Sequence, residues 1–387
     1  FIHEIIRYSM IYTIINTILY LIVFFYYRRK IKKLDFYTFI ISLYGITAIL
    51  CSLNYRLTPE EWKDLSLFPF IYLWGIIMIF LLPLKNFSVR TTNTHFHDSK
   101  WLKYLSYFYI LCAFIDIATS LSDTIALFQS GEWGSLRNEL YADEDSIKLY
   151  SNQWNRLMKN ICGYLSPFAV VYAFLQLSKK GIKKYYTIIL FISIIGPSFI
   201  SATVEASRGI IMQLAINLFI SYLLFRHLIP QNRKKYIYLL STLILLGFVA
   251  YSLIVTISRF GENNAGNSLF MYFGHSMLYF NDGVFNNLHE YAWGKRFFSW
   301  FIDLLGGNSY YSAAKAGATH GSAFYTIVGG MFIDWGPYLT IVVAFVTVFF
   351  IKRFFKRKTI HLSDTVMIVF YVSTLANGIF VFGKGRA

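Results

Sequence analysis

The sequence is divided into long apolar runs by short clusters of charged residues. Both faces of a helix drawn through these runs are apolar, so amphipathic surface helices do not explain them. A run of about 20 apolar residues is the length needed to cross the hydrocarbon core of a bilayer. The pattern therefore predicts an all-α polytopic membrane protein, with residues 1–387 forming a single transmembrane domain. We expect about ten or more transmembrane helices, near residues 5–27, 36–54, 66–84, 104–124, 155–177, 185–205, 209–228, 236–258, 323–351 and 362–383.

Clusters of basic residues follow every second apolar run. They lie at 28–33, 85–103, 179–184, 226–235 and 352–358. The cytoplasmic loops of polytopic membrane proteins carry an excess of Lys and Arg. With ten spans all five clusters fall on one side of the membrane, which we expect to be the cytoplasm. The other side then holds two long extracytoplasmic loops, near 129–154 and 259–322.

The composition agrees with this interpretation. Hydrophobic residues make up 56% of the chain and charged residues 14%, and the mean hydropathy is +0.49. A soluble domain normally carries about a quarter charged residues. The net charge of +16 is held in runs beside apolar segments, so it indicates membrane topology and argues against nucleic acid as a partner.

The 259–322 loop is the longest stretch that does not span the membrane. Long loops in compact proteins are usually functional or disordered, and this one is too rich in aromatic residues to be disordered. Within it, Ser268–Phe280 and Phe297–Leu305 mix aromatic and aliphatic residues with few charges, which predicts short helices at the membrane interface. The working face is therefore expected to be extracytoplasmic.

Some arginines fall on the side where the positive-inside rule disfavours them. They are Arg137, Arg156, Arg208 and Arg259. One interpretation is that they extend to lipid headgroups or pair with an acid such as Glu205 or Glu262. The other is a clamp for phosphate, because guanidinium stays charged and binds phosphate oxygens with two parallel hydrogen bonds. Arg208, in Ser207-Arg208-Gly209 between two spans, and Arg259, at the start of the long loop, are the pair we favour for it.

His320 is the histidine best placed to act as a general base. It lies just before the ninth apolar run on the outer side, and the pKa of an unperturbed imidazole lies near neutral pH. An ordinary loop histidine is the alternative, and His275 and His289 in the same loop compete for the role. His95 and His97 are too few to bind a metal in a cytoplasmic loop, and we expect no metal site.

Acidic residues interrupt the fourth and the ninth apolar runs. Asp116 lies in the middle of the fourth run, with Asp123 seven positions later on the same helical face. A carboxylate inside the membrane usually faces a polar cavity, so Asp116 indicates a substrate cavity or a proton path. Asp334 precedes Gly336-Pro337, a pair that predicts a kink or break, and its carboxylate can satisfy backbone groups that the break frees.

Taken together, these residues resemble the bacterial O-antigen polymerase family (Wzy-type oligosaccharide repeat-unit polymerases), which is related to the O-antigen ligases. The likeness lies in Ser207-Arg208-Gly209 at the start of an apolar span and in a long outer loop that begins at an arginine, here Arg259. It continues in His320 followed by Gly329-Gly330 and Asp334-Trp335-Gly336, where Gly321 stands in place of the family's Asn.

The resemblance implies a metal-independent glycosyltransferase with a GT-C-like fold and no cofactor, located in the bacterial cytoplasmic (inner) membrane. Donor and acceptor would be oligosaccharides on a polyprenyl diphosphate such as undecaprenyl diphosphate, joined in O-antigen (lipopolysaccharide), capsule or exopolysaccharide biosynthesis. A chain-length regulator protein is the usual partner of such enzymes. Arg208 and Arg259 would bind the diphosphate and His320 would be the base. Further substrate contacts are expected from Arg137, Arg156, His275 and Asp116.

Two other functions remain open on the sequence alone. An O-antigen ligase would transfer the glycan to lipid A core, but its size is larger and its His segment more regular than the one here. A polysaccharide transporter or flippase often shows an internal repeat, and none is visible in this sequence. The long outer loop also favours an enzyme over a transporter that alternates between two open states.

Overall fold

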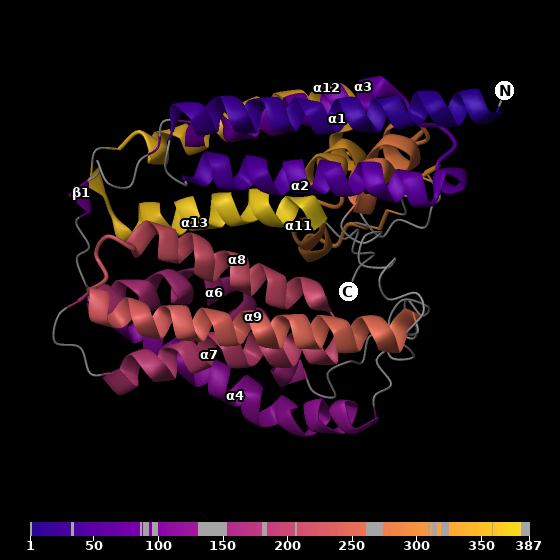
Figure 1. The fold of residues 1–387 in the computed structure, drawn as a ribbon. Coiled ribbons are helices and arrows are strands. Elements are labelled where there is room, and N and C mark those ends of the chain that lie inside the picture. The colour runs from indigo at the N-terminus through magenta and orange to yellow at the C-terminus, as the bar shows by residue number, and fades with distance from the viewer. Residues whose placement is uncertain are drawn as a thin grey trace. The chain divides into compact units, whose positions relative to one another are not determined.

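The computed structural model describes most of the chain, and it is almost entirely helical there (Figure 1). It divides into two compact units, of which unit 1 is Phe1–Phe87, Gly266–Lys356 and Thr374–Ala387, and unit 2 is Ser88–Ala265 and Arg357–Ser373. The single transmembrane domain expected from the sequence stays a prediction. The described residues are 2–31, 35–85, 87, 93–94, 100–130, 153–179, 184–205, 207–260, 274–308, 310–311, 316–318, 325–357 and 359–380.

Unit 1 is built on four long helices, α1 (Ile2–Lys30), α2 (Phe36–Leu57), α3 (Leu67–Leu81) and α12 (Ile327–Phe355). Helix α1 packs against α2 and α3, and α12 packs against α3. Asp35 and Thr38 form a capping box at the start of α2, in which the Thr38 N–H donates to the Asp35 carboxylate at 2.8 Å. The short elements are η1 (Pro59–Glu61), η2 (Leu82–Leu84), the π-helical η5 (Phe280–Phe285), α11 (Ser299–Leu304) and η7 (Gly378–Phe380).

Unit 2 is a bundle of five helices, α4 (Lys100–Ser130), α6 (Gln153–Ser178), α7 (Lys184–Val204), α8 (Arg208–Phe225) and α9 (Gln231–Phe260). Helices α4, α6 and α7 pack on one another, and α8 packs on α6, α7 and α9. The two-residue strands β1 (Asn93–Thr94) and β2 (Thr359–Ile360) form a parallel pair. Helix α13 (Leu362–Asn377) follows, and its residues from Thr374 onward are grouped with unit 1.

A helix lies at each of the ten apolar runs of the sequence. Seven of them, α1–α4, α6, α7 and α12, are long and apolar enough to cross a membrane, judged on the described residues. Helices α8 and α13 are apolar but shorter, and α9 is not among the seven. The all-α, multi-pass membrane architecture therefore has structural support, whereas the count of ten spans stays a prediction.

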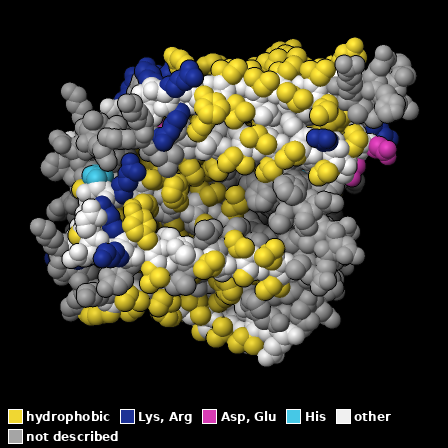
Figure 2. All heavy atoms as spheres, viewed as in Figure 1, with side chains coloured by type: hydrophobic (Ala, Val, Ile, Leu, Met, Phe, Trp, Pro, Cys, Tyr) yellow, Lys and Arg dark blue, Asp and Glu magenta, His cyan; other side chains and the backbone are white. Residues whose placement is uncertain are grey.

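The outer surfaces of the helices carry large apolar side chains. Phe25 and Tyr26 on α1 are more than half exposed, as are Phe349 and Phe350 on α12. Figure 2 shows hydrophobic side chains over much of the visible face of the described helices. Such a surface is expected where the surrounding medium is lipid, because lipid chains solvate apolar side chains as well as a protein core does.

The basic residues gather at one end of each unit. In unit 1 the Tyr27 hydroxyl donates to the Lys85 carbonyl, and the rings of Phe87 and Phe355 are 4.9 Å apart, so the ends of α1, α3 and α12 meet. In unit 2 Nη1 of Arg233 donates to the carbonyls of Leu177 and Lys179, each at 2.7 Å, and joins the start of α9 to the end of α6. We call these the basic ends. Their existence agrees with the predicted cytoplasmic side.

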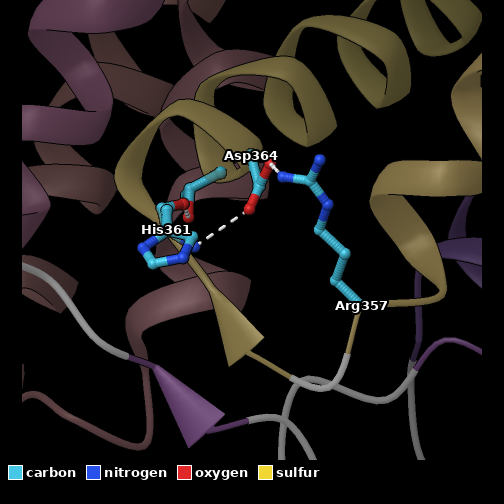
Figure 3. A network of polar contacts seen from close by, with 4 residues as sticks. Arg357, His361 and Asp364 are labelled. Carbon is cyan, nitrogen blue, oxygen red and sulfur yellow. Dashed lines mark hydrogen bonds and ion pairs between the residues drawn. The ribbon is translucent and has the colours of Figure 1, made fainter.

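A polar network holds the start of α13 in unit 2 (Figure 3). The Asp364 carboxylate accepts hydrogen bonds from Nη1 of Arg357 at 2.5 Å and from the His361 N–H at 3.0 Å. The Thr365 hydroxyl donates to the His361 carbonyl at 3.1 Å. An acid in the first turn that bonds the capping residue's N–H is half of a capping box. The network is thus local helix capping, and it contains none of the predicted site residues.

Helix α12 is broken at the predicted position. Gly336 has φ +69° and ψ −177°, a conformation essentially restricted to glycine. Pro337 has no N–H, so the carbonyl of Ile333 loses its usual partner in the helix. The N–H of Ala292 donates to that carbonyl at 2.8 Å, and the N–H of Gly294 donates to the Asp334 carbonyl at 3.4 Å. The segment before α11 is therefore hydrogen-bonded to the break in α12.

The two helices predicted at the membrane interface have different outcomes. Residues 274–279 are helical and continue into η5, but Met277, Leu278 and Tyr279 are fully buried, so an interface position is wrong for the described part of Ser268–Phe280. A sequence rich in apolar residues serves a buried core equally well. Helix α11 lies within Phe297–Leu305, and its side chain Phe301 is 55% exposed. That helix is confirmed, and its exposed face suits an interface.

We expect Gly336→Ala to lower the free energy of unfolding by about 1–3 kcal/mol, because alanine disfavours this backbone conformation and its Cβ would lie 3.0 Å from the Tyr291 ring. The matched control is Gly75→Ala in α3, where an added Cβ meets nothing within 4 Å. Thermal unfolding of both purified variants in detergent measures the difference. Equal midpoints would mean that the break in α12 is not a fixed feature.

Candidate functional site

The turn between α7 and α8 is fixed by one carbonyl group. The carbonyl of Ala202 accepts the Ser207 N–H at 2.8 Å and the Tyr251 hydroxyl at 2.6 Å. Both Ala202 and Tyr251 are buried, and Ile211 of α8 packs with them. The second hydrogen bond comes from α9, so the turn is tied to that helix as well as to its own chain.

This arrangement places two of the predicted arginines at one end of unit 2. Arg208 is the first residue of α8, directly after the capping residue Ser207. Arg259 lies eight positions after Tyr251 on α9 (251 to 259), about 12 Å further along the helix axis. Arg233 and the basic end lie at the other end of α9. We call the end with Arg208 and Arg259 the arginine end; the side chains of both arginines lie outside the described part.

The start of α6 belongs to the same end. Lys159 of α6 forms an ion pair with Glu205, which follows the last residue of α7. Arg156 lies three positions before Lys159 on α6, and its side chain also lies outside the described part. Lys159 thus binds the Glu205 carboxylate in the described part. The pairing of Glu205 with an arginine stays a prediction, because the arginine side chains lie outside that part. The proposed partner Glu262 lies outside the described residues.

The backbone adds positive electrostatic potential at the arginine end, in addition to the charge of the side chains. Helices α6 and α8 both begin there, and the N-terminus of a helix carries roughly half a positive charge with free N–H groups. Such termini bind anions. By backbone position alone, this end of unit 2 is suited to an anionic ligand.

Asp116 is buried in unit 2, with 1% of its surface exposed. Neither carboxylate oxygen has a hydrogen-bond partner among the described residues. Lys159 interacts with it electrostatically, and Cys162 of α6 lies close to it. Asp116 thus faces α6 inside the bundle. The role of a substrate contact stays a prediction, and the side chain of Asp123 is outside the described part.

His275 lies in unit 1, between two aromatic rings, edge-to-face with Trp62 and stacked with Tyr279. Its ring is 4.7 Å from that of Trp62 and 5.9 Å from that of Tyr279. Gly274 before it leaves room for α2, since an added Cβ would lie 2.3 Å from the Leu50 carbonyl oxygen. These contacts show how the histidine is packed. Its contact with substrate stays a prediction.

Two of the predicted site residues, His320 and Arg137, lie outside the described residues. On either side of His320, Ala318 and Tyr325 are both buried in unit 1. The roles of His320 as base and Arg137 as substrate contact stay predictions.

Arg296 is the residue that the sequence interpretation missed. Its Nη2 donates to the Tyr325 hydroxyl at 2.6 Å, and its guanidinium carbon lies 5.1 Å from the centre of the Tyr325 ring. Its backbone N–H donates to the Asp334 carboxylate at 3.2 Å. The signal was present, because Arg296 is another arginine in the long loop assigned to the outer side, where each arginine needs a reason.

The phenols around Arg296 remain protonated near neutral pH. Burial raises the pKa of Tyr325 although Arg296 lowers it in part. Burial also raises the pKa of Tyr311 to about 12, and its hydroxyl donates to the Glu290 carbonyl at 2.5 Å. Neither phenol therefore neutralises the guanidinium.

The described residues contain no group of three or more His, Cys, Asp or Glu side chains that could hold a metal ion. Comparison of the chain with models of known families, with curated proteins and with solved structures finds no match. The candidate site consequently stands on its residues alone.

We expect Tyr251→Phe to destabilise unit 2 by about 1 kcal/mol, because it removes the hydrogen bond that ties α9 to the α7–α8 turn while Ser207 still satisfies the Ala202 carbonyl. Tyr238→Phe on the same helix is the control. Its hydroxyl pairs with that of Tyr222 at an exposed site, so a change within about 0.5 kcal/mol is expected. Denaturation monitored by hydrogen exchange of α8 and α9 measures both, and equal effects would argue against the tie.

Proposed function

We propose that the protein is a membrane glycosyltransferase that polymerises polyprenyl-diphosphate-linked oligosaccharide repeat units. The observation that carries the proposal is the arginine end of unit 2, where the backbone brings Arg156, Arg208 and Arg259 together with two helix N-termini, away from the basic end. A cluster of positive charge on the side where it is disfavoured needs an anionic ligand, and a lipid diphosphate is one that arrives from the membrane.

The chemistry follows from the charge that develops during transfer. A hydroxyl oxygen of the acceptor glycan attacks the anomeric carbon of the donor, and the bond from that carbon to the diphosphate oxygen breaks. The electron pair leaves with the diphosphate, where Arg208 and Arg259 stabilise it more strongly in the transition state than in the bound donor. His320 accepts the proton of the attacking hydroxyl. The glycan chain is lengthened, and free polyprenyl diphosphate is released.

The other predicted residues have supporting roles in this proposal. In this proposal Arg156, at the start of α6, contacts the diphosphate or the first sugar, and Arg137 is a further substrate contact. Asp116 and His275 contact polar parts of the substrate. No nucleotide sugar, cofactor or metal takes part in the reaction, and a chain-length regulator is the expected protein partner.

We place the enzyme in the bacterial inner membrane with a GT-C-like arrangement of helices and an extracytoplasmic active face. The length of α12 suits a span between the two faces of the membrane. From Asp334 near the Arg296 segment to Arg353 at the basic end are 19 residues, about 28 Å of helix, which matches the hydrocarbon core of about 30 Å. The basic ends then lie in the cytoplasm, and the opposite ends lie at the outer surface.

The proposal predicts that purified protein in nanodiscs converts lipid-linked repeat units into a ladder of longer glycans, with chelator present and no nucleotide sugar added. Arg208→Ala and Arg259→Ala should each lower the rate by roughly two to three orders of magnitude, because one charge contact to the leaving group is lost. Lysine should restore little activity at either position, since it lacks the planar fork. His320→Ala should also abolish elongation. Gel separation of the products measures the ladder.

Arg353→Ala is the matched control, because this arginine lies at the basic end over the rings of Phe349 and Phe350. It should leave the ladder unchanged. A ladder that survives the Arg208, Arg259 and His320 changes would keep the activity and reject the residues. Transfer to lipid A core without a ladder would identify a ligase, and movement of lipid-linked units across the bilayer without transfer would identify a flippase.

A further inference from the structure

The segment that carries Arg296 is held rigidly in unit 1. The N–H groups of Ala292 and Gly294 donate hydrogen bonds to carbonyls at the break in α12. The Phe298 N–H donates to the Gly294 carbonyl at 2.8 Å and continues the turn. Gly294 has φ +80°, and an added Cβ would lie 2.7 Å from the Trp335 ring. The Arg296 backbone is therefore fixed on both sides before any ligand binds.

The guanidinium group is fixed in orientation but is not saturated. One N–H of Nη2 is used by the Tyr325 hydroxyl, and the guanidinium carbon lies over the Tyr325 ring. Nη1 is buried and has no hydrogen-bond partner among the described residues. A guanidinium has five N–H donors, and a buried donor without a partner costs about 1–3 kcal/mol. A group arranged in this way gains by binding an acceptor.

The guanidinium of Arg296 interacts electrostatically with Asp334 but forms no ion pair with it in the described part of the chain. No carboxylate of the described part forms an ion pair with its guanidinium within 4.0 Å, although two other ion pairs are present. Asp334 is the nearby acid, and its carboxylate accepts the backbone N–H of Arg296. The phenols of Tyr311 and Tyr325 stay neutral near neutral pH because their pKa values are raised.

We propose that Arg296, oriented by Tyr325, forms an oxyanion-binding site in unit 1, separate from the arginines of unit 2. Its ligand is a group with two equivalent oxygens on a planar or tetrahedral centre, as in the carboxylate of an acidic sugar or in a phosphate. Nη1 of the guanidinium, a buried donor without a partner among the described residues, supplies the hydrogen bonds that such oxygens accept. The site needs no turnover, so it stands whether or not the polymerase activity is confirmed.

The surroundings are compatible with either source of the oxyanion. Trp293, three positions before Arg296, is 66% exposed and has φ +51°, a backbone conformation that non-glycine residues rarely adopt. An exposed indole held in this way can pack against a sugar ring or lie in the headgroup layer. The segment can thus bind either an acidic sugar of the glycan or a phosphate of a lipid.

The test measures ligand binding by the full chain in maltoside detergent, which carries neither charge nor phosphate. Arg208→Gln and Arg259→Gln are introduced first, so that the arginine end of unit 2 does not contribute. The thermal midpoint is then followed against sodium glucuronate and against sodium phosphate, with sodium chloride at equal ionic strength as reference, and apparent dissociation constants are derived from the rise of the midpoint.

We expect the oxyanions to raise the midpoint beyond chloride, and Arg296→Gln to weaken binding at least about tenfold through loss of charge-assisted hydrogen bonds. Arg296→Lys should bind more weakly than arginine because it lacks the fork, and it keeps the test valid if the glutamine variant does not fold. Tyr325→Phe should weaken binding less than Arg296→Gln. Arg353→Gln, at an arginine that also lies over aromatic rings, should change nothing.

The two probes separate the sources of the ligand. Tighter binding of glucuronate would identify an acidic sugar, and tighter binding of phosphate would identify a phosphoryl group. In the second case, competition by phosphatidylglycerol added to the detergent would assign it to a lipid headgroup. The proposal is overturned if Arg296→Gln or Arg296→Lys binds both oxyanions as tightly as its parent, or if neither oxyanion exceeds chloride.

Discussion

A helix that ends or breaks inside a membrane protein leaves carbonyl groups that water does not reach, and other parts of the protein must supply their donors. The break in α12 and the turn between α7 and α8 are both built on that constraint. In unit 1, Pro337 removes the donor for the Ile333 carbonyl, and the Ala292 N–H replaces it. In unit 2, α7 ends before α8 begins, and the Ala202 carbonyl accepts Ser207 and Tyr251. Each carbonyl fixes a distant segment, and each segment carries an arginine.

The consequence is that charge is placed by the backbone before ligand arrives. Preorganised charge costs no rearrangement at the moment of reaction, which is the condition for strong stabilisation of a leaving diphosphate. On the proposed function, the arginine end of unit 2 would serve the diphosphate. Arg296 would hold an oxyanion in unit 1. On the same proposal the basic ends would serve a different purpose, since an excess of cations is typical of cytoplasmic loops.

The helices could be predicted closely from the sequence because length and hydropathy alone determine them. The run expected at 36–54 is α2 (Phe36–Leu57), and the break at Gly336-Pro337 follows from the missing N–H of proline. The core position of residues 274–280 could not be predicted, because apolar side chains suit a core and an interface alike. The Asp334 carboxylate accepts the Arg296 N–H, 38 positions away, and no local pattern encodes such a contact.

The most direct measurement is a cryo-electron microscopy map of the protein in nanodiscs with a bound polyprenyl-diphosphate oligosaccharide. The proposed function predicts that density for the diphosphate lies at the start of α8, within hydrogen-bond distance of the guanidinium groups of Arg208 and Arg259. Density for the diphosphate at the basic ends, beside Arg233 or Arg353, would contradict it. So would a bound glycolipid whose diphosphate contacts neither Arg208 nor Arg259.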